Sequence, residues 1–198
     1  MALILLRHTL VDLPAGTCYG QLDAPLRWPA EPPFEVVAAR LREALKPGLH
    51  LSHIVSSPLQ RARLLAAELA TRWGLAVSTD ARWQELDFGA WEGQPWATID
   101  RSHSDHWAED VWDRAPPGGE TLQALTARVL AAADDLRPAA SQPGQAVLVV
   151  AHAGPIRVLL GAALGQPPQA PLPMALDLGG CHVLQADDQA PGGWRIGA

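Results

Sequence analysis

Three short, mainly apolar segments constrain the fold more than any other feature of this sequence. The clearest spans residues 146–151, a shorter one spans residues 2–6, and the third, residues 53–56, has Ile54-Val55 between a histidine and a serine. Strands with one face in water alternate apolar and polar residues, whereas continuous runs of this length are typical of strands buried on both faces. A sheet buried on both faces needs helices to cover it, so these runs predict an α/β fold.

Segments with the spacing of amphipathic helices stand between and after these runs. Apolar residues recur three and four positions apart in four such segments, residues 34–45, 58–73, 120–136 and 155–164. Pro32-Pro33 opens the first and Pro47-Gly48 closes it. Before the second, Ser57 is placed to cap the helix, and Gln60 completes a capping box. Strands that alternate with helices predict a mostly parallel sheet covered on both faces.

The remaining segments carry weaker signals. The proline-rich stretch 11–33 predicts a long loop, and residues 75–78 predict a short strand. Residues 81–113 predict a loop with one or two short helices. Residues 174–178 and 181–185 predict a closing hairpin around Gly179-Gly180. No polar linker divides the chain, so we expect a single domain over residues 1–198.

Tryptophan is concentrated in one part of the chain. The sequence holds eight Trp, and five of them lie between residues 83 and 112, at Trp83, Trp91, Trp96, Trp107 and Trp112. Large aromatic side chains more often pack beneath a loop than form a ligand cage, although one cluster can do both. We therefore expect a Trp-rich lid or insert around residues 90–118.

Charge and cysteine content exclude several classes of protein. A net charge of −6 without a Lys/Arg run argues against a nucleic-acid or anionic-membrane partner. Cys18 and Cys181 are too few for a disulfide framework or a cysteine metal cluster. No apolar run approaches the length of a membrane span. The apolar start at residues 1–6 is too short for a secretory segment, so we expect a cytoplasmic protein.

Basic side chains follow three of the predicted strands at the point where each strand ends. Arg7-His8 follows the first, Ser57 leads to Arg61 after the second, and His152 follows the run at residues 146–151. Parallel strands place all three ends at one edge of the sheet, which is where α/β folds bind ligands. Two of these ends run into helix N-termini, whose N–H groups favour an anion. Arginine forks match phosphate oxygens, so the edge predicts a pocket for a phosphoryl group.

A phosphate site with two imidazoles also predicts a reaction. A neutral histidine can attack phosphorus and form a phosphohistidine that water later breaks. The leaving alkoxide needs a proton, and the segment 85–93 offers Glu85, Asp87 and Glu92 as donors. Glu85 comes soonest after a strand end, which favours it without excluding Asp87.

Each of these residues also has a purely structural interpretation. Arg61 could be a solvated helix residue, and His152 could be a core histidine; only their joint placement favours function. The remaining histidines, His50, His53 and His182, are interpreted as structural. The spacing of four further residues suits a metal site, but polar helix-surface residues are the better explanation, so we expect no metal. These are His103, Asp105, His106 and Glu109.

Five ordered blocks of the sequence resemble the histidine phosphatase superfamily, which includes the phosphoglycerate mutases. The blocks are Leu6-Arg7-His8-Thr9, residues 56–62, residues 85–93, Pro117-Gly118-Gly119-Glu120-Thr121 and Val150-Ala-His152-Ala-Gly154. The resemblance implies a three-layer α/β/α sandwich and a reaction that needs neither metal nor cofactor. It implies His8 as the phosphorylated nucleophile, with Arg7, Arg61 and His152 binding the phosphoryl group. It implies Glu85 as the proton donor.

The loop after the nucleophile departs from the family pattern. Thr9 stands where the family commonly has Gly, and Val11 and Pro14 replace polar residues that include a phosphate-binding Asn. Thr9 or Thr17 is left as the hydroxyl that could take the place of that Asn. The loop over residues 16–26 is most similar to the α-ribazole phosphatase branch, which implies substrate contacts at Tyr19 and Gly20.

These observations favour a phosphomonoesterase that acts on a small phosphorylated substrate. The branch resemblance points to α-ribazole 5′-phosphate, in adenosylcobalamin nucleotide-loop assembly. A broad-specificity small-molecule phosphatase and a phosphoglycerate mutase-like enzyme are alternatives. A non-catalytic phosphate-binding module is a third, although the five filled chemical positions argue against it. Monomer and homodimer are both compatible with the sequence.

Overall fold

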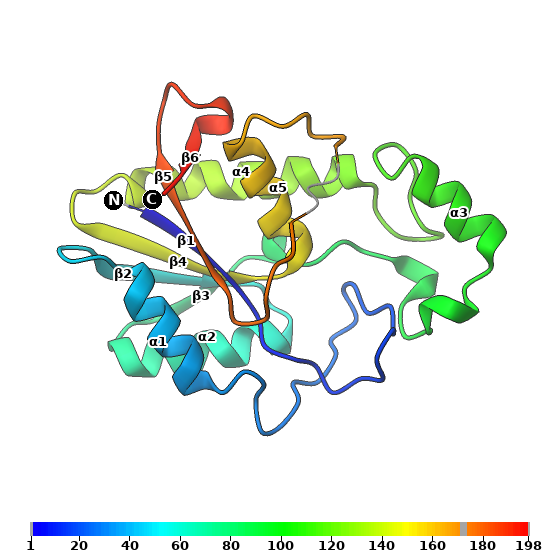
Figure 1. Ribbon diagram of the computed structural model, residues 1–198, viewed down its shortest axis with the longest axis horizontal. Coiled ribbons are helices and arrows are strands. Elements are labelled where there is room, and N and C mark those ends of the chain that lie inside the picture. The colour runs from blue at the N-terminus through cyan, green and yellow to red at the C-terminus, as the bar shows by residue number, and fades with distance from the viewer. Residues whose placement is uncertain (1, 171–173, 198) are drawn as a thin grey trace.

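A six-stranded mixed sheet forms the centre of the computed structural model, which describes residues 2–170 and 174–197 (Figure 1). Its strand order is β3-β2-β4-β1-β5-β6. The pairs β3-β2, β2-β4 and β4-β1 are parallel, whereas β5 runs antiparallel to both β1 and β6. The strands span Ala2–Arg7, His50–Ser56, Val77–Thr79, Gln145–Ala151, Cys181–Ala186 and Trp194–Ile196 for β1 to β6. The predicted mostly parallel sheet is confirmed.

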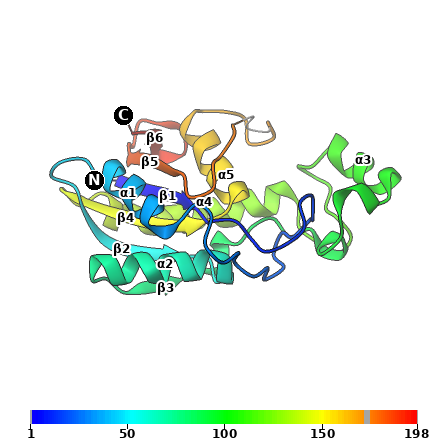
Figure 2. The same ribbon diagram turned by 60° about the horizontal axis from the view of Figure 1, so that its bottom comes forward.

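Helices cover both faces of this sheet, so the molecule has three layers (Figure 2). One face packs against α1 (Phe34–Ala44) and α2 (Gln60–Trp73), and the other packs against α4 (Leu122–Ala140) and α5 (Ala153–Ala163). The central strands β1 and β4 supply both cores, because successive side chains of a strand point to opposite faces. Ile4 and Leu148 lie in the first core, while Leu5 and Val149 lie in the second.

Each helix that covers the sheet differs from its predicted bounds by one to four residues at one end or both. The capping box at α2 does not form: the helix begins at Gln60 without a side-chain bond from its own N-cap. Its first N–H is bound instead by Asp23, a loop residue 37 positions earlier, at 2.6 Å. Helix α4 continues past its predicted end at residue 136 to Ala140, with Pro138 in its last turn.

The predicted C-terminal hairpin is wrong, because β5 does not pair with residues 174–178. Residues 174–178 form no strand, and β5 pairs with β1 and with β6. The turn at Gly179-Gly180 is held by the end of β1, because the N–H of Arg7 donates to the carbonyl of Gly180 and the N–H of Gly179 donates to that of Arg7. The true partner, β6, has only three residues and carries no periodic signal.

A long excursion between β3 and α4 holds most of the tryptophans. It contains three short 3₁₀ helices, Ala81–Trp83, Gly89–Trp91 and Trp96–Thr98, followed by α3 (Arg101–Glu109). Figures 1 and 2 show α3 standing apart from the helices that cover the sheet. Phe88, Trp91, Trp96 and Trp107 pack together with ring centroids 5.2–6.4 Å apart, mostly edge to face. Within the described residues, no helix is long and apolar enough to cross a membrane.

Candidate active site

The carboxyl ends of β1, β2 and β4 bring the predicted basic residues together, as their parallel order requires. The N–H of His8 donates to the carbonyl of Ala151, which joins the ends of β1 and β4. The imidazoles of His8 and His152 lie 5.0 Å apart between ring centroids. Arg61, on the first turn of α2, reaches His152 with its Nε at 3.2 Å. The structure therefore assembles one cluster from residues far apart in the sequence.

His8 is held neutral with its proton on a defined nitrogen. Its side chain is 2% exposed, and Nδ1 lies 2.6 Å from the carbonyl oxygen of Thr9. A carbonyl oxygen can only accept, so Nδ1 carries the proton and Nε2 keeps a lone pair. Burial, aided by the positive charges of Arg61 and Arg7, lowers the pKa of His8 to about 3. His8 thus has the protonation state of a nitrogen nucleophile.

His152 is also neutral, with its proton on the other nitrogen. Its Nδ1 accepts the N–H of Arg61, and its Nε2 therefore donates to Oγ of Ser57 at 2.8 Å. Burial, together with the positive surroundings of His8 and Arg61, holds the pKa of His152 well below its usual value. Ser57, expected as a helix cap, is used here to fix the tautomer of His152.

Arg61 is fully buried and fixed on several sides. Its guanidinium donates to the carbonyls of Gly20 at 2.5 Å and Leu22 at 2.8 Å, in addition to His152. Its Cζ lies 5.0 Å from the ring centroid of Tyr19. Burial lowers the pKa of Arg61, and the nearby charge of Glu85 opposes that shift. A guanidinium has five N–H groups, so two remain for a ligand.

Tyr19 and Gly20 thus contact Arg61, and Gly20 has a packing role as well. A Cβ at Gly20 would lie 2.1 Å from Oε1 of Glu92 and 2.5 Å from the carbonyl oxygen of Leu86. Only glycine allows this approach, which lets the Gly20 carbonyl reach the guanidinium of Arg61.

Arg7 has one guanidinium nitrogen bound to the protein and another that is available to a ligand. Its Nη1 donates to the carbonyl of Leu176 at 2.6 Å. Its Nε is buried without a hydrogen-bond partner among the residues that the structure describes. A buried donor without a partner is costly, and a bound anion would satisfy it.

The three candidate carboxylates have different surroundings, which the sequence alone did not separate. Glu85 accepts from the N–H of Gly154 at 3.0 and 3.2 Å, at the start of α5. The carboxylate of Asp87 binds the N–H of Gly89, and that of Glu92 binds the N–H groups of Gln21 and Phe88. Asp87 and Glu92 therefore hold loops, and only Glu85 reaches the strand end beside His152.

The two helix N-termini expected to favour a phosphate are both occupied by protein carboxylates. Asp23 binds the first N–H of α2, and Glu85 binds an N–H in the first turn of α5. Both helix N-termini therefore bind negative charge, as expected, but protein carboxylates supply it rather than a phosphate. The arginines and imidazoles remain as the groups available to a phosphoryl ligand.

Sequence reasoning missed the residue that positions the Glu85 segment. Arg128 of α4 donates to the carbonyls of Arg82, Gln84 and Glu85 at 2.6–2.9 Å. It also forms a two-point ion pair with Glu120, whose Oε1 accepts from Nη2 at 2.5 Å and whose Oε2 accepts from Nε at 3.1 Å. A single arginine on a long helix gives no signal of this kind in a sequence. Glu120, by contrast, lies in one of the blocks that carried the family resemblance.

The two hydroxyls considered for the altered loop lie in different environments. Oγ1 of Thr17 donates to the carbonyl of Pro14 at 2.7 Å and is occupied. Thr9 is fully buried beside His8, and its Oγ1 has no partner among the described residues. Cys18 is buried and packs with Trp91 and Ile99.

The residues with metal-like spacing lie on α3, and three of them pair with other side chains. Arg101 pairs with Asp105, and Glu109 pairs with Arg114 and lies 3.9 Å from His106. Within residues 2–170 and 174–197, no three His, Cys, Asp or Glu side chains are grouped to hold a metal ion.

Comparison with known proteins agrees with this geometry. The family model described as histidine phosphatase superfamily (branch 1) matches residues 3–196. Glucosyl-3-phosphoglycerate phosphatase of Mycobacterium tuberculosis (strain ATCC 25618 / H37Rv) is 35% identical over 216 aligned residues, which cover 98% of this chain and 92% of that protein. A probable phosphoglycerate mutase of Yersinia enterocolitica is 32% identical and covers 89% of this chain and 81% of its own.

Two solved structures superpose on this chain over its whole length. The native mycobacterial glucosyl-3-phosphoglycerate phosphatase superposes with a TM-score of 0.78 at 31% identity, covering 100% of this chain and 97% of its own. The α-ribazole phosphatase of Shigella flexneri superposes with a TM-score of 0.80, covering 100% and 95%. At 23% identity, this second likeness shows the fold alone.

Proposed function

This chain is a phosphatase of branch 1 of the histidine phosphatase superfamily, and on that premise we propose that it hydrolyses a small phosphate monoester through a phosphohistidine on His8. The observation that carries the proposal is the state of His8. The ring is buried and neutral, and Nδ1 is bound to the Thr9 carbonyl, so the lone pair lies on Nε2. That is the form of imidazole that attacks phosphorus.

In the first step, Nε2 of His8 forms a bond to phosphorus while the bond from phosphorus to the alcohol oxygen breaks. The electron pair of that bond goes to the alcohol oxygen, which takes a proton from the carboxylic acid form of Glu85. The products are the free alcohol and a phosphohistidine.

In the second step, the Glu85 carboxylate removes a proton from water, and the water oxygen attacks phosphorus. The bond between phosphorus and Nε2 breaks, and its electron pair returns to His8. Inorganic phosphate leaves, and both residues regain their starting forms. One carboxyl group serves both steps because Gly154 and Leu86 hold it in place through their N–H groups.

Charge on the phosphoryl oxygens is stabilised by Arg7, Arg61 and His152. Arg61 retains two N–H groups after its internal bonds, and Nε of Arg7 has no partner within the described residues. Nε2–H of His152 transfers its hydrogen bond from Ser57 to a phosphoryl oxygen. The two arginines are fixed by their bonds to the protein, and fixed donors stabilise a transition state without reorganisation.

Thr9 is our proposed replacement for the missing loop Asn. Its hydroxyl is buried next to His8 without a partner among the described residues, whereas Thr17 already bonds Pro14. A Thr9→Val variant should weaken inhibition by inorganic phosphate, and Thr17→Val should leave that inhibition unchanged.

Two substrates are supported by different observations. The loop over residues 16–26 resembles α-ribazole phosphatases and supports α-ribazole 5′-phosphate, with Tyr19 and Gly20 near the substrate. The 35% identity to glucosyl-3-phosphoglycerate phosphatase supports glucosyl-3-phosphoglycerate instead. Turnover of these two esters, measured beside a panel of sugar phosphates and nucleotides, decides between them, and equal rates throughout would favour a broad-specificity phosphatase.

The excursion over residues 90–118 is proposed to act as a lid of a single domain. It is joined to the substrate loop by a β-bridge between Thr17 and Pro95, and the N–H of Cys18 donates to the carbonyl of Gln94. Its tryptophan fluorescence should change when phosphate or a substrate analogue binds. Fluorescence that does not respond to a saturating ligand would make it a packing element.

Replacing His8 by alanine tests the proposal. His8→Ala should lose essentially all turnover of phosphate monoesters, with the fold retained by circular dichroism. A non-catalytic binding module would keep its phosphate affinity and show no turnover in the parent protein either. Hydrolysis at the parent rate by His8→Ala would overturn the phosphohistidine mechanism.

A further inference from the structure

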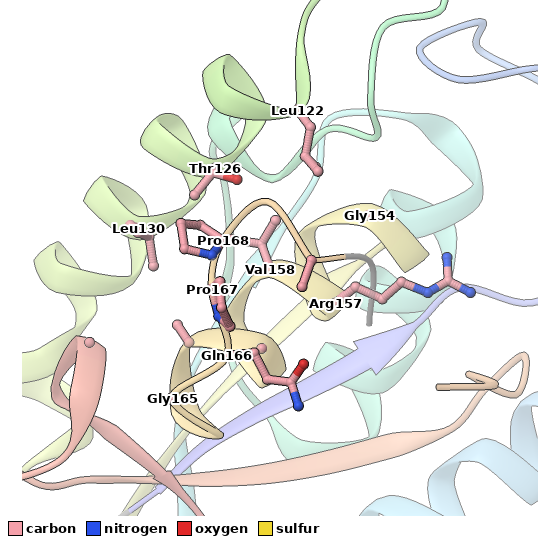
Figure 3. Close-up of a pocket in the computed structure, with 14 residues that line it drawn as sticks. Leu122, Thr126, Leu130, Gly154, Arg157, Val158, Gly165, Gln166, Pro167 and Pro168 are labelled. Atoms are coloured by element: carbon pink, nitrogen blue, oxygen red, sulfur yellow. The ribbon is translucent and has the colours of Figure 1, made fainter. Parts of the chain in front are cut away.

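An elongated cavity lies between α4, α5 and the loop that follows α5. Its volume is about 320 Å³, within the range of small-molecule sites. Figure 3 shows side chains from both helices and from the loop facing this space. Those that define its walls are Leu122, Thr126 and Leu130 of α4, Val158 of α5, and Pro167 and Pro168 of the loop.

One end of this α4–α5 cavity lies at Gly154, the residue whose N–H is bound by the carboxylate of the proposed proton donor, Glu85. Ala162, in the last turn of α5, also lines the cavity, so its wall extends about 12 Å along the helix at 1.5 Å per residue. The cavity therefore extends away from the carboxylate that protonates the departing alcohol oxygen.

The lining is mostly apolar, and its polar side chains are Thr126, Arg157 and Gln166. The guanidinium of Arg157 points away from the α4 side of the cavity in Figure 3. Thr126 is only 7% exposed, and its hydroxyl points toward α5 without a hydrogen-bond partner among the residues that the structure describes. Thr126 lines the cavity, so its hydroxyl is available to hydrogen-bond a ligand atom there.

We propose that the α4–α5 cavity binds the alcohol part of the ester, and that it takes an elongated apolar group with one hydrogen-bonding atom opposite Thr126. The inference rests on the proposed function, because it places the leaving group at Glu85. A group with many hydroxyls does not suit this lining, since most of them would be desolvated without partners, so the inference counts against glucosyl-3-phosphoglycerate as the substrate. An alkyl chain or a flat aromatic ring system suits it.

A series of straight-chain alkyl phosphates from ethyl to octyl tests directly whether the cavity binds the alcohol part of the ester. Their leaving alcohols have nearly the same acidity, so chain length changes the apolar contact and not the chemistry. In the parent protein, kcat/KM should rise by up to about fourfold per added methylene until the cavity is full. The Ki of the matching alkyl phosphonates, which are not hydrolysed, should fall along the same series.

Gly161 provides the variant that fills the cavity. A Cβ built at this helical glycine meets nothing within 4 Å, so a larger side chain enters open space without strain. In Gly161→Leu, the ratio of kcat/KM for octyl to ethyl phosphate should fall at least tenfold below the parent ratio. Gly161→Ala is the matched control and should lower that ratio only slightly.

Thr126→Val tests the polar contact. It should weaken binding of a phosphonate with an ether oxygen in its chain, and leave the isosteric all-carbon phosphonate unaffected.

Each outcome separates this inference from the proposed function. A flat alkyl series, with turnover still dependent on His8, overturns the cavity assignment and keeps the phosphatase mechanism. Absence of His8-dependent turnover for every ester overturns the proposed function. The phosphonate series in the parent protein decides the inference even if Gly161→Leu does not fold.

Discussion

Helices α2 and α5 both follow a strand of the parallel sheet, and each has a protein carboxylate at its N-terminus. At α2, Asp23 accepts the N–H of Gln60, and its own carbonyl accepts from the Gln60 side chain at 2.7 Å. At α5, Glu85 accepts the N–H of Gly154. The same physics produces both contacts, because the exposed N–H groups of a first turn attract negative charge.

The surroundings of the two carboxylates differ. Asp23 is exposed, and its two contacts fasten a loop to a helix. Glu85 is half-buried, binds a residue that lines the α4–α5 cavity, and has the largest effect of any neighbouring charge on the pKa of Arg61. A carboxylate on a helix N-terminus is therefore a structural cap by default. It becomes chemically useful where imidazoles and guanidiniums border the same space.

Among the variants that test this difference between Asp23 and Glu85, Glu85→Gln should have the largest effect on kcat/KM. Glutamine keeps an oxygen for Gly154 but has no acidic proton, so alkyl phosphates should lose about 100-fold or more in kcat/KM. p-Nitrophenyl phosphate, whose leaving group needs little protonation, should lose far less. The matched control, Asp23→Asn, should affect both substrates equally. Equal losses on both substrates in Glu85→Gln would show that Glu85 is not the proton donor.

Gly154→Ala should have the next largest effect. A Cβ there would lie 2.1 Å from Oε1 of Glu85, so the carboxylate must move off its N–H anchor. A displacement of this size should cost about 10- to 100-fold in kcat on alkyl phosphates. Glu85→Asp is shorter by one methylene and should restore part of that loss in the Gly154→Ala background. If the losses of kcat in Gly154→Ala and Glu85→Asp simply added up in the double variant, without any rescue, the contact between these two residues would be contradicted.

Acid should destabilise the folded protein through its two buried imidazoles, because His152 is bonded to residues at the start of α2 and directly precedes α5. Burial lowers the pKa of His8 to about 3 and that of His152 well below its usual value. Between pH 6.5 and about 3, the unfolded chain therefore binds more protons than the folded one. The free energy of unfolding should fall as pH decreases, by at most about 1.4 kcal/mol per pH unit for each imidazole.

Urea denaturation at a series of pH values between 7 and 4 measures this slope. His8→Asn should reduce it, since asparagine takes up no proton. An unchanged slope in His8→Asn would mean that His8 does not enter the folded state as a neutral, buried ring.

The parts predicted from sequence are those that local pattern determines. The apolar runs of β1, β2 and β4 fixed the parallel order, and that order alone placed Arg7, His8, Arg61 and His152 at one edge. β6 was missed because three residues cannot show a period. The choice of Glu85 over Asp87 could not be made either, because it depends on how the backbone turns between residues 85 and 92.

Long-range contacts account for the rest. Asp23 replaces the predicted capping box from 37 residues away, and Arg128 holds the carbonyl of Glu85 from 43 residues away. Both contacts depend on tertiary packing, and the sequence near each residue gives no sign of them. The α4–α5 cavity depends in the same way on how two helices pack against a proline-containing loop.

The central claim, a phosphoryl group carried on His8, is tested most directly by trapping the intermediate. Rapid mixing with a radiolabelled phosphate ester, followed by denaturation in base, should leave label on the protein that is stable to base and released by acid. Peptide mapping should place the label at His8, and His8→Ala should carry none. Turnover in the parent protein without any trapped label, or label that persists in His8→Ala, would contradict the mechanism.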